Sequence, residues 1–208
     1  MKQERAVRTR QALILSAAEA FERCGYTRTK LTEISSNAGV SRGALHFHFE
    51  NKAVVAGTVE ATAAATLRRT ATEARQSGDN ALQRLIGTSR AMAEQLSDDV
   101  VARAGYHLSC EASDGTGLDL RGEWYRCVQR MITETAAERL LAENVSEQEA
   151  VTSIVAATTG FEVLGRTDPR WLAAEGLDRF WRLLLPSLVT AEALATLDAP
   201  ARDRADAA

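Results

Sequence analysis

Proline, cysteine and aromatic residues are all scarce in this sequence. Proline occurs three times in 208 residues and aromatic residues make up 5%, whereas alanine and leucine are abundant. A chain that is rich in strong helix formers and poor in helix breakers is typical of an all-α protein. The three cysteines, Cys24, Cys110 and Cys127, are odd in number and lack a framework spacing, so we expect free thiols in a reducing compartment.

The sequence also lacks long hydrophobic runs and the signatures of common catalytic sites. No run of about 18 apolar residues occurs, so we expect no membrane span. The first residues, MKQERAVRTRQ, have no apolar core after their charges, which argues against a secretory signal and for a cytoplasmic protein. No nucleophile elbow, paired-acid motif, zinc signature or phosphate loop is present. We therefore expect no enzyme and no cofactor. His107 and Cys110 have no further ligands nearby in the sequence, so we also expect no metal ion.

The net charge of −3 conceals an uneven distribution along the chain. Residues 1–55 contain nine Lys and Arg against five acidic residues, which gives +4, and the remainder carries −7. A module that binds phosphates, attached to a body that avoids DNA, would show this asymmetry. A plain solvated surface would show it as well, so the charge alone does not decide between the two.

The most informative segment is Leu31–Lys52, LTEISSNAGVSRGALHFHFENK, which predicts two short helices joined by a tight turn. Thr32 is expected to cap the first helix through its hydroxyl, and Gly39 to end it in the left-handed region. Ser41 is expected to cap the second helix, which begins at Arg42. This is a helix-turn-helix layout, in which the start of the second helix faces the base edges of DNA.

Apolar residues at helical spacing predict further helices around this motif. Those from Ile14 to Phe21 would form the buried face of a first helix at about 5–23. Breakers and caps divide the rest into helices at about 52–76, 80–96, 98–112, 119–143, 147–164 and 175–189, with a loop at 113–117. Pro186 predicts a kink or a break in the last helix. We predict an all-α protein with a three-helix DNA-binding domain at 1–51 and a helical ligand-binding and dimerisation domain at 52–208.

Residues 8–55 closely resemble the DNA-binding domain of the TetR family of bacterial repressors, along TRQALILSAAEAFERCGYTRTKLTEISSNAGVSRGALHFHFENKAVV. The variant GALHFHF is similar to the γ-butyrolactone autoregulator receptors of antibiotic-producing actinobacteria. Arg103-Ala104-Gly105 followed by Leu108, and Glu123-Trp124, also look similar to that subfamily. The resemblance implies a homodimeric repressor of antibiotic production. It would bind a pseudo-palindromic double-stranded DNA operator and leave it when a small hydrophobic, lactone-like ligand binds.

Eight residues are candidates for DNA contact: Thr29, Lys30, Ser41, Arg42, Gly43, His46, His48 and Lys52. Arg42 could contact guanine O6 and N7 or only a phosphate. Ser41 could bind a phosphate or serve as a cap alone. Gly43 would let the helix approach the DNA closely.

The other candidates are expected to bind phosphates. Thr29 and Lys30 precede the first helix of the motif, and Lys52 begins a helix whose orphan N–H groups attract anions. Relatives in the resembled family mostly carry a phosphate-contacting Tyr where this chain has His46, which implies a similar role. His48 could bind a phosphate or be structural. The apolar residues of the second helix are predicted to lie in the core: Ala44, Leu45, Phe47 and Phe49.

Candidates for the ligand site lie in the body of the chain. Trp124 lies on the apolar side of a long helix and would be an ordinary core residue by itself, but relatives in the resembled subfamily have a pocket-lining Trp there. Thr158 and Thr159 interrupt the apolar run IVAATTGF, and their hydroxyls could bind a ligand or a helix carbonyl. Helices 147–164 and 175–189 are expected to form a four-helix dimer interface. A sensor of drugs or antibiotic products and an all-helical enzyme are the alternatives.

Overall fold

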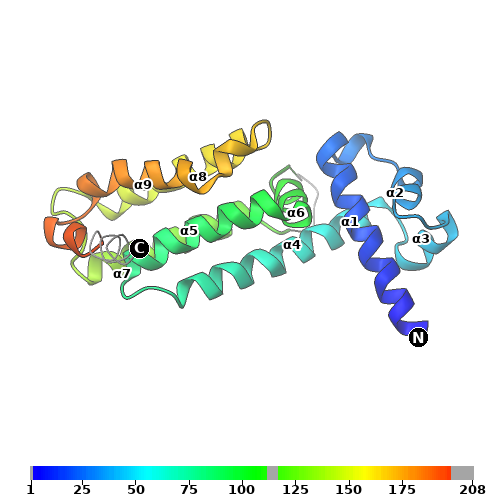
Figure 1. Cartoon of the computed structure of the whole chain (residues 1–208), viewed down its shortest axis with the longest axis horizontal. Coiled ribbons are helices and arrows are strands. Elements are labelled where there is room, and N and C mark those ends of the chain that lie inside the picture. Colours follow the sequence, from blue (N-terminus) through cyan, green and yellow to red (C-terminus); the bar gives the residue numbers. More distant parts are fainter. Residues whose placement is uncertain (1, 112–116, 198–208) are drawn as a thin grey trace, which may run out of the picture. The chain divides into compact units, whose positions relative to one another are not determined.

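The computed structural model describes residues 2–111 and 117–197, and it confirms the all-α prediction over these ranges (Figure 1). The helices are α1 (Lys2–Arg28), α2 (Leu31–Asn37), α3 (Arg42–His48), α4 (Lys52–Arg75), α5 (Ala81–Asp98), α6 (Val100–Glu111), α7 (Leu120–Ala137), α8 (Glu147–Gly165), the 3₁₀ helix η1 (Pro169–Leu172) and α9 (Ala174–Leu188). None of the helices in the described ranges has the length and apolarity that a membrane crossing requires. The loop predicted at 113–117 lies outside the described residues except for Gly117.

Two helix boundaries differ from the sequence prediction for identifiable reasons. The prediction that α7 runs to residue 143 is wrong, because the backbone turns at Arg139 (φ 59°) and the Leu140 N–H returns to the Thr135 carbonyl. The segment after it pairs with the end of α9 through an antiparallel bridge between Leu141 and Val189. Helix α9 continues through Pro186 to its last turn, so the predicted break does not occur there, and the alternative of a kink stays a prediction.

The described residues form two compact units. Unit 1 consists of residues 2–69, 95–111 and 117–121, and unit 2 consists of residues 70–94 and 122–197. Helix α4 therefore contributes to both units, and so does α5. The boundary at residue 51 between a DNA-binding domain and a ligand-binding domain concerns function and not compactness, and it stays a prediction.

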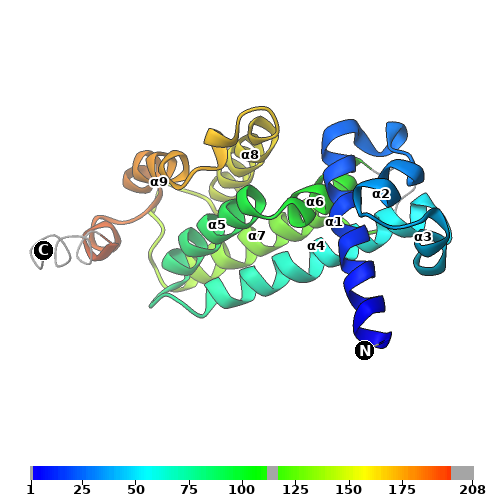
Figure 2. The same ribbon diagram turned by 45° about the vertical axis from the view of Figure 1, so that its right-hand side comes forward.

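Unit 1 is built on α1, which packs on α2 and α6 (Figure 2). Within α1 the helical backbone is interrupted at Gly25, where φ is 73°. Helix α2, the first helix of the helix-turn-helix, follows α1. The core of this unit joins all of its helices, and its larger members are Leu13, Ile14, Phe21, Ile34, Leu45, Phe49, Val55, Val59 and Leu108.

A close crossing of α4 and α6 also belongs to unit 1. Gly105 of α6 lies so near to α4 that a Cβ atom at this position would be 2.4 Å from the Ala63 Cβ and 2.7 Å from the Val59 carbonyl oxygen. Only glycine fits at this point without displacing one of the two helices.

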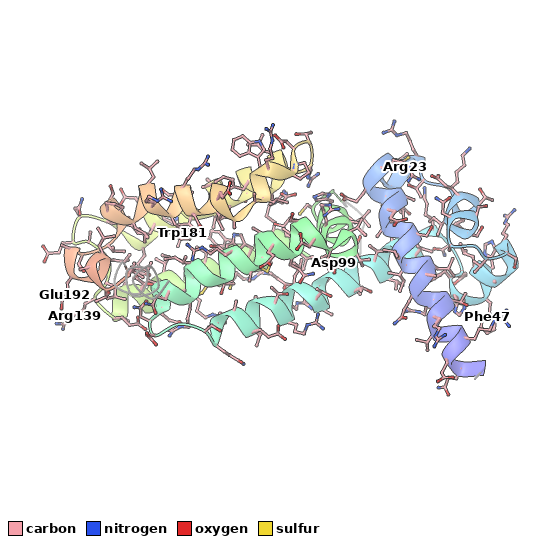
Figure 3. All side chains as sticks on the ribbon, viewed as in Figure 1. Arg23, Phe47, Asp99, Arg139, Trp181 and Glu192 are labelled. Atoms are coloured by element: carbon pink, nitrogen blue, oxygen red, sulfur yellow. The ribbon has the colours of Figure 1, made fainter. Side chains whose placement is uncertain are left out.

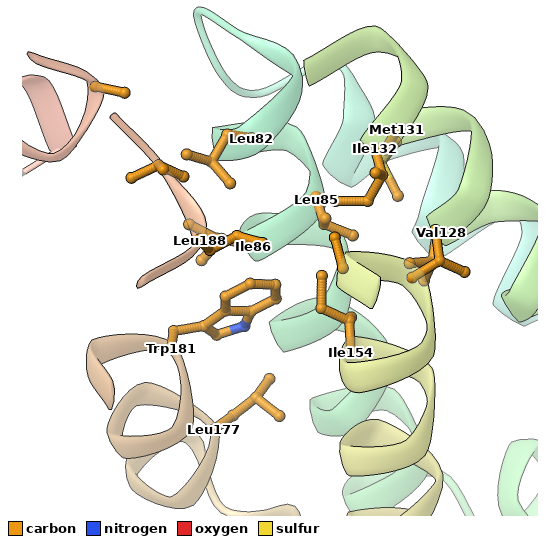
Figure 4. Packing of buried hydrophobic residues seen from close by; sticks show 14 of the residues in the cluster. Leu82, Leu85, Ile86, Val128, Met131, Ile132, Ile154, Leu177, Trp181 and Leu188 are labelled. Atoms are coloured by element: carbon orange, nitrogen blue, oxygen red, sulfur yellow. The ribbon is translucent and has the colours of Figure 1, made fainter. Parts of the chain in front are cut away.

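Unit 2 has a separate apolar core that is formed by α5, α7, α8 and α9 (Figure 4). Its labelled members are Leu82, Leu85, Ile86, Val128, Met131, Ile132, Ile154, Leu177, Trp181 and Leu188. The Trp181 indole N–H donates to Ser89 Oγ at 2.9 Å, so its polar atom has a partner inside the core. A Ser146–Glu149 capping box starts α8.

Candidate DNA interface and ligand site

Three residues of the helix-turn-helix were predicted to cap or end a helix, and two of them, Gly39 and Ser41, have the predicted geometry. Gly39 is in the left-handed region (φ 67°), and Ser41 Oγ accepts a hydrogen bond from the Ala44 N–H at 3.1 Å. The prediction that Thr32 caps α2 is wrong. The helix begins one residue before Thr32, and the N–H groups of Glu33 and Ile34 donate to the carbonyl of Lys30.

Helix α3 exposes one face that contains three of the DNA-contact candidates. Arg42, Gly43 and His46 are exposed, and the Arg42 Nε donates to His46 Nε2 at a long 3.5 Å. Residue 46 lies one turn after residues 42 and 43, so the three residues share a side of the helix. This face can present a guanidinium and an imidazole to DNA. Gly43 has no side chain, so the helix can approach the DNA closely at this position.

The fourth member of that face is Phe47, which is 81% exposed. The prediction that Phe47 lies in the core is wrong, whereas Leu45 and Phe49 are fully buried as predicted. Adjacent core positions on a helix are three or four residues apart, so Leu45 and Phe49 share a face and Phe47 lies opposite. Figure 3 labels Phe47 on the outer side of this region. The spacing was a readable signal that the sequence prediction missed.

The end of α3 is held in place by aromatic contacts. His48 is half-buried, and its ring meets the Phe47 ring edge-on at 5.2 Å between centroids. The Arg10 guanidinium of α1 lies over the Phe49 ring at 5.5 Å from the centroid. His48 therefore lies beside the exposed face of α3 and supports its aromatic end.

Two further candidates bind atoms of the protein itself. The Thr29 side chain is 2% exposed, and its hydroxyl is within hydrogen-bond distance of the carbonyls of Ala20 (3.1 Å) and Gly25 (2.8 Å). The Lys52 ammonium donates to the carbonyls of Tyr26, Thr27 and Thr29 at 2.9, 3.2 and 3.2 Å. These bonds fix the link between α1 and α2, which in turn positions the exposed Lys30.

Lys52→Met is expected to weaken operator binding and to make its salt dependence shallower, by about 0.9 for each phosphate that the ammonium no longer neutralises. The substitution removes a positive charge at the start of α4 and leaves three carbonyls of the α1–α2 link without their donor. Operator titrations at several salt concentrations measure both quantities, with Arg130→Gln on α7 as a control for the loss of one exposed charge. If binding is weaker but the slope of its salt dependence is unchanged, Lys52 does not neutralise a phosphate and only positions the α1–α2 link.

A network of charged groups connects α1 to α6 within unit 1. The Glu22 carboxylate accepts from Arg103 Nε at 2.9 Å and lies 2.6 Å from His107 Nδ1. Burial alone would raise the pKa of Glu22, but the hydrogen bonds and charges of His107 and Arg103 outweigh it, so this pKa is lowered. Arg103 Nη1 also donates to the carbonyls of Leu96 and Ser97. The network thus ties α1 to both α6 and the end of α5.

His107 has a partner in this network, and no group of three or more His, Cys, Asp or Glu side chains in the described ranges could hold a metal ion. All three cysteines are free, as predicted.

The ligand candidates lie in unit 2, where Trp124 of α7 meets Thr158 of α8. The Trp124 indole N–H donates to Thr158 Oγ1 at 2.8 Å, and this oxygen lies 2.8 Å from the Ile154 carbonyl. Trp124 is 8% exposed and Thr159 is half-buried. The structure therefore brings Trp124 and Thr158 together and shows the bond to a helix carbonyl that the sequence left as one alternative.

Helices α8 and α9 also expose apolar side chains on the outside of unit 2. Helix α8 presents small residues at Ser153 and Ala156 and larger ones at Val163 and Leu164, and Leu183 of α9 is 82% exposed. Small and apolar residues on exposed faces let two helices from different subunits approach closely and exclude water.

Comparison with known proteins decides the family. The sequence pattern of the bacterial regulatory proteins of the tetR family matches residues 13–57. The chain is also 31% identical to the A-factor receptor protein of Streptomyces griseus over 99% of its own length and 75% of that protein. The chain belongs to the TetR family of bacterial regulatory proteins.

Solved structures with a similar fold agree with this assignment. A gamma-butyrolactone receptor described as an ArpA-like protein superimposes with a TM-score of 0.78 at 28% identity, covering 91% of this chain and 92% of that one. The TetR family protein CprB of Streptomyces coelicolor, in complex with its operator sequence, superimposes with a TM-score of 0.77 at 29% identity, covering 96% and 99%. The similarity of this TetR-family chain thus extends well beyond the helix-turn-helix.

Proposed function

We propose that this TetR-family chain is a ligand-responsive transcriptional repressor. It binds a pseudo-palindromic operator as a homodimer and is released by a small hydrophobic signal, a γ-butyrolactone-like autoregulator that controls antibiotic production. It acts in the bacterial cytoplasm and associates with the nucleoid when it is bound to its operator. The observation that carries the proposal is the similarity to a protein named A-factor receptor over 99% of this chain, since the helix-turn-helix alone supports only a generic regulator.

The proposed DNA contacts divide into two groups. The exposed face of α3 enters the major groove, where Arg42 contacts a guanine or a phosphate and His46 contacts a phosphate. Lys30, Ser41 and His48 contribute phosphate contacts, Lys52 attracts phosphate through its charge at the start of α4, and Thr29 contributes by holding the α1–α2 link. The α3 helices of a dimer must then lie roughly 34–36 Å apart to reach successive major grooves.

Ligand binding is proposed to change this spacing. Trp124, Thr158 and Thr159 contribute to the ligand site in unit 2, with the indole stacking on the ligand and a hydroxyl bonding to its lactone oxygen. Helix α4 continues from unit 1 into unit 2 and is proposed to transmit the change as a lever. A nearly complete release requires the ligand to favour the DNA-incompetent conformer by ~5.5 kcal/mol.

Two titrations test the proposal. Duplexes are first selected from a random pool by the purified full-length protein, and the proposal requires an inverted repeat that is bound far more tightly than random DNA. The complex is then titrated with γ-butyrolactones, furans and antibiotics. Release by lactones alone supports the proposal, and release by antibiotics alone would make the protein a drug sensor. The absence of any preferred duplex would exclude a repressor.

Trp124→Phe is expected to raise the lactone concentration needed for half-release at least about tenfold, while operator affinity stays the same. The change removes the indole N–H and part of the stacking surface but preserves much of the core volume. Trp181→Phe is the matched control, because it removes a comparable buried indole hydrogen bond from the same unit. An unaltered response in Trp124→Phe would place the ligand elsewhere.

A further inference from the structure

Phe47 is an unexplained feature of the exposed face of α3. Two large apolar side chains in the described ranges are more than 80% exposed, namely Phe47 and Leu183, and Leu183 lies on a helix proposed for the dimer interface. Phe47 has no such assignment. An aromatic ring left in water on a proposed contact surface indicates that a partner covers it.

The ring is held in a defined position. In α3, residues 42 and 46 are one turn apart, as are residues 43 and 47, so the two neighbouring pairs form one exposed side of the helix. The Phe47 ring meets the His48 ring at an interplanar angle of 84°, and the buried Phe49 side chain anchors the end of the helix. Phe47 therefore projects beside Arg42 and His46 as part of one rigid surface.

The charge of this surface identifies the kind of group that covers Phe47. Residues 1–55 carry a net +4, and Arg42 and His46 lie on the same exposed side of α3 as the ring, so the partner is an anionic polymer that also offers an apolar group. In the major groove of DNA the apolar group is the C5-methyl of thymine, whereas phosphates and the other base edges are polar.

We propose that Phe47 reads a thymine methyl group in each half of the operator and is a specificity-determining residue. The inference rests on the proposed function, because it requires α3 to enter the major groove. Arg42 and Phe47 are five residues apart, which is about 7.5 Å along the helix axis. Since neighbouring bases are about 3.4 Å apart, the thymine lies about two base steps from the position that Arg42 contacts.

The experiment combines one change in the DNA with one change in the protein. Each thymine of the selected operator is replaced in turn by deoxyuridine, which removes only the methyl group and keeps the O4 acceptor. Wild-type affinity is expected to fall about fourfold for one substituted half-site and about 15-fold for both, at a single thymine position. Phe47→Ala should bind every uracil duplex as tightly as the thymine duplex, and Phe47→Leu should keep part of the preference.

Leu15→Ala is the matched control, because it removes another exposed apolar side chain from unit 1 without touching α3, and it should retain the full methyl dependence. If wild-type protein binds all uracil duplexes equally, or if Phe47→Ala keeps the wild-type dependence, the inference is wrong although the protein still recognises its operator. If no operator is selected at all, the proposed function fails first.

Discussion

Leu183→Glu is expected to convert the dimer into monomers and to lower operator affinity by about a hundredfold or more. Leu183 is 82% exposed in the single chain, whereas its neighbours Leu177, Trp181 and Leu188 face the core of unit 2. A leucine on the outer face of α9 is buried only when another subunit covers it. A carboxylate there would be buried without a partner in the dimer, which costs several kcal/mol.

The loss of operator affinity follows from the loss of bivalent binding. Two linked recognition helices bind more tightly than one by a factor of about 10²–10⁴, and a monomer forfeits this advantage. Sedimentation velocity measures the oligomeric state, and operator titration measures the affinity. Tyr125→Glu, at an exposed position of α7 in the same unit, controls for the added charge. A Leu183→Glu protein that still sediments as a dimer would move the interface away from this face of α9.

Gly105→Ala is expected to lower the free energy of unfolding by about 1–3 kcal/mol, although alanine is the better helix former. The added Cβ would lie 2.4 Å from the Ala63 Cβ and 2.7 Å from a backbone oxygen, so α6 or α4 must shift. Backbone atoms cannot move aside by rotating, unlike the end of a flexible side chain. Urea denaturation of the two proteins measures the difference.

Gly87→Ala is the matched control for this substitution. Gly87 lies in α5, and the nearest atom to a new Cβ would be the Ser77 carbonyl oxygen at 4.0 Å. Without a clash the higher helix propensity of alanine should raise the free energy of unfolding by up to about 1 kcal/mol. Equal stabilities of Gly105→Ala and Gly87→Ala would show that α4 and α6 separate without cost.

Residues that act through their neighbours in the chain could be read from the sequence. The Ser41 cap, the turn at Gly39 and the Ser146–Glu149 capping box depend on backbone N–H groups within four residues, so local spacing determines them. The class of the protein was readable for the same reason, because an all-helical composition and a dense local motif need no long-range contact to be recognised.

Residues that act through distant partners could not be read in this way. The sequence gives Lys52 a charge at the start of a helix, but the structure places its ammonium against three carbonyls 23 to 26 residues away. No local pattern marks Glu22, which is the centre of a network with Arg103 and His107. The members of this network meet only when α1 and α6 pack together.

The amino-acid order by itself determined that this chain is helical, where its recognition helix begins, and which family it resembles. The spacing of Leu45, Phe47 and Phe49 shows that Phe47 lies on the opposite face from the other two, and the tertiary structure decided which of the two faces is buried in the core of unit 1. It also decided that Trp124 and Thr158 meet, because a hydrogen bond between α7 and α8 depends on how those helices pack. Burial and pairing are properties of surfaces brought together by folding, and a linear pattern specifies them only indirectly.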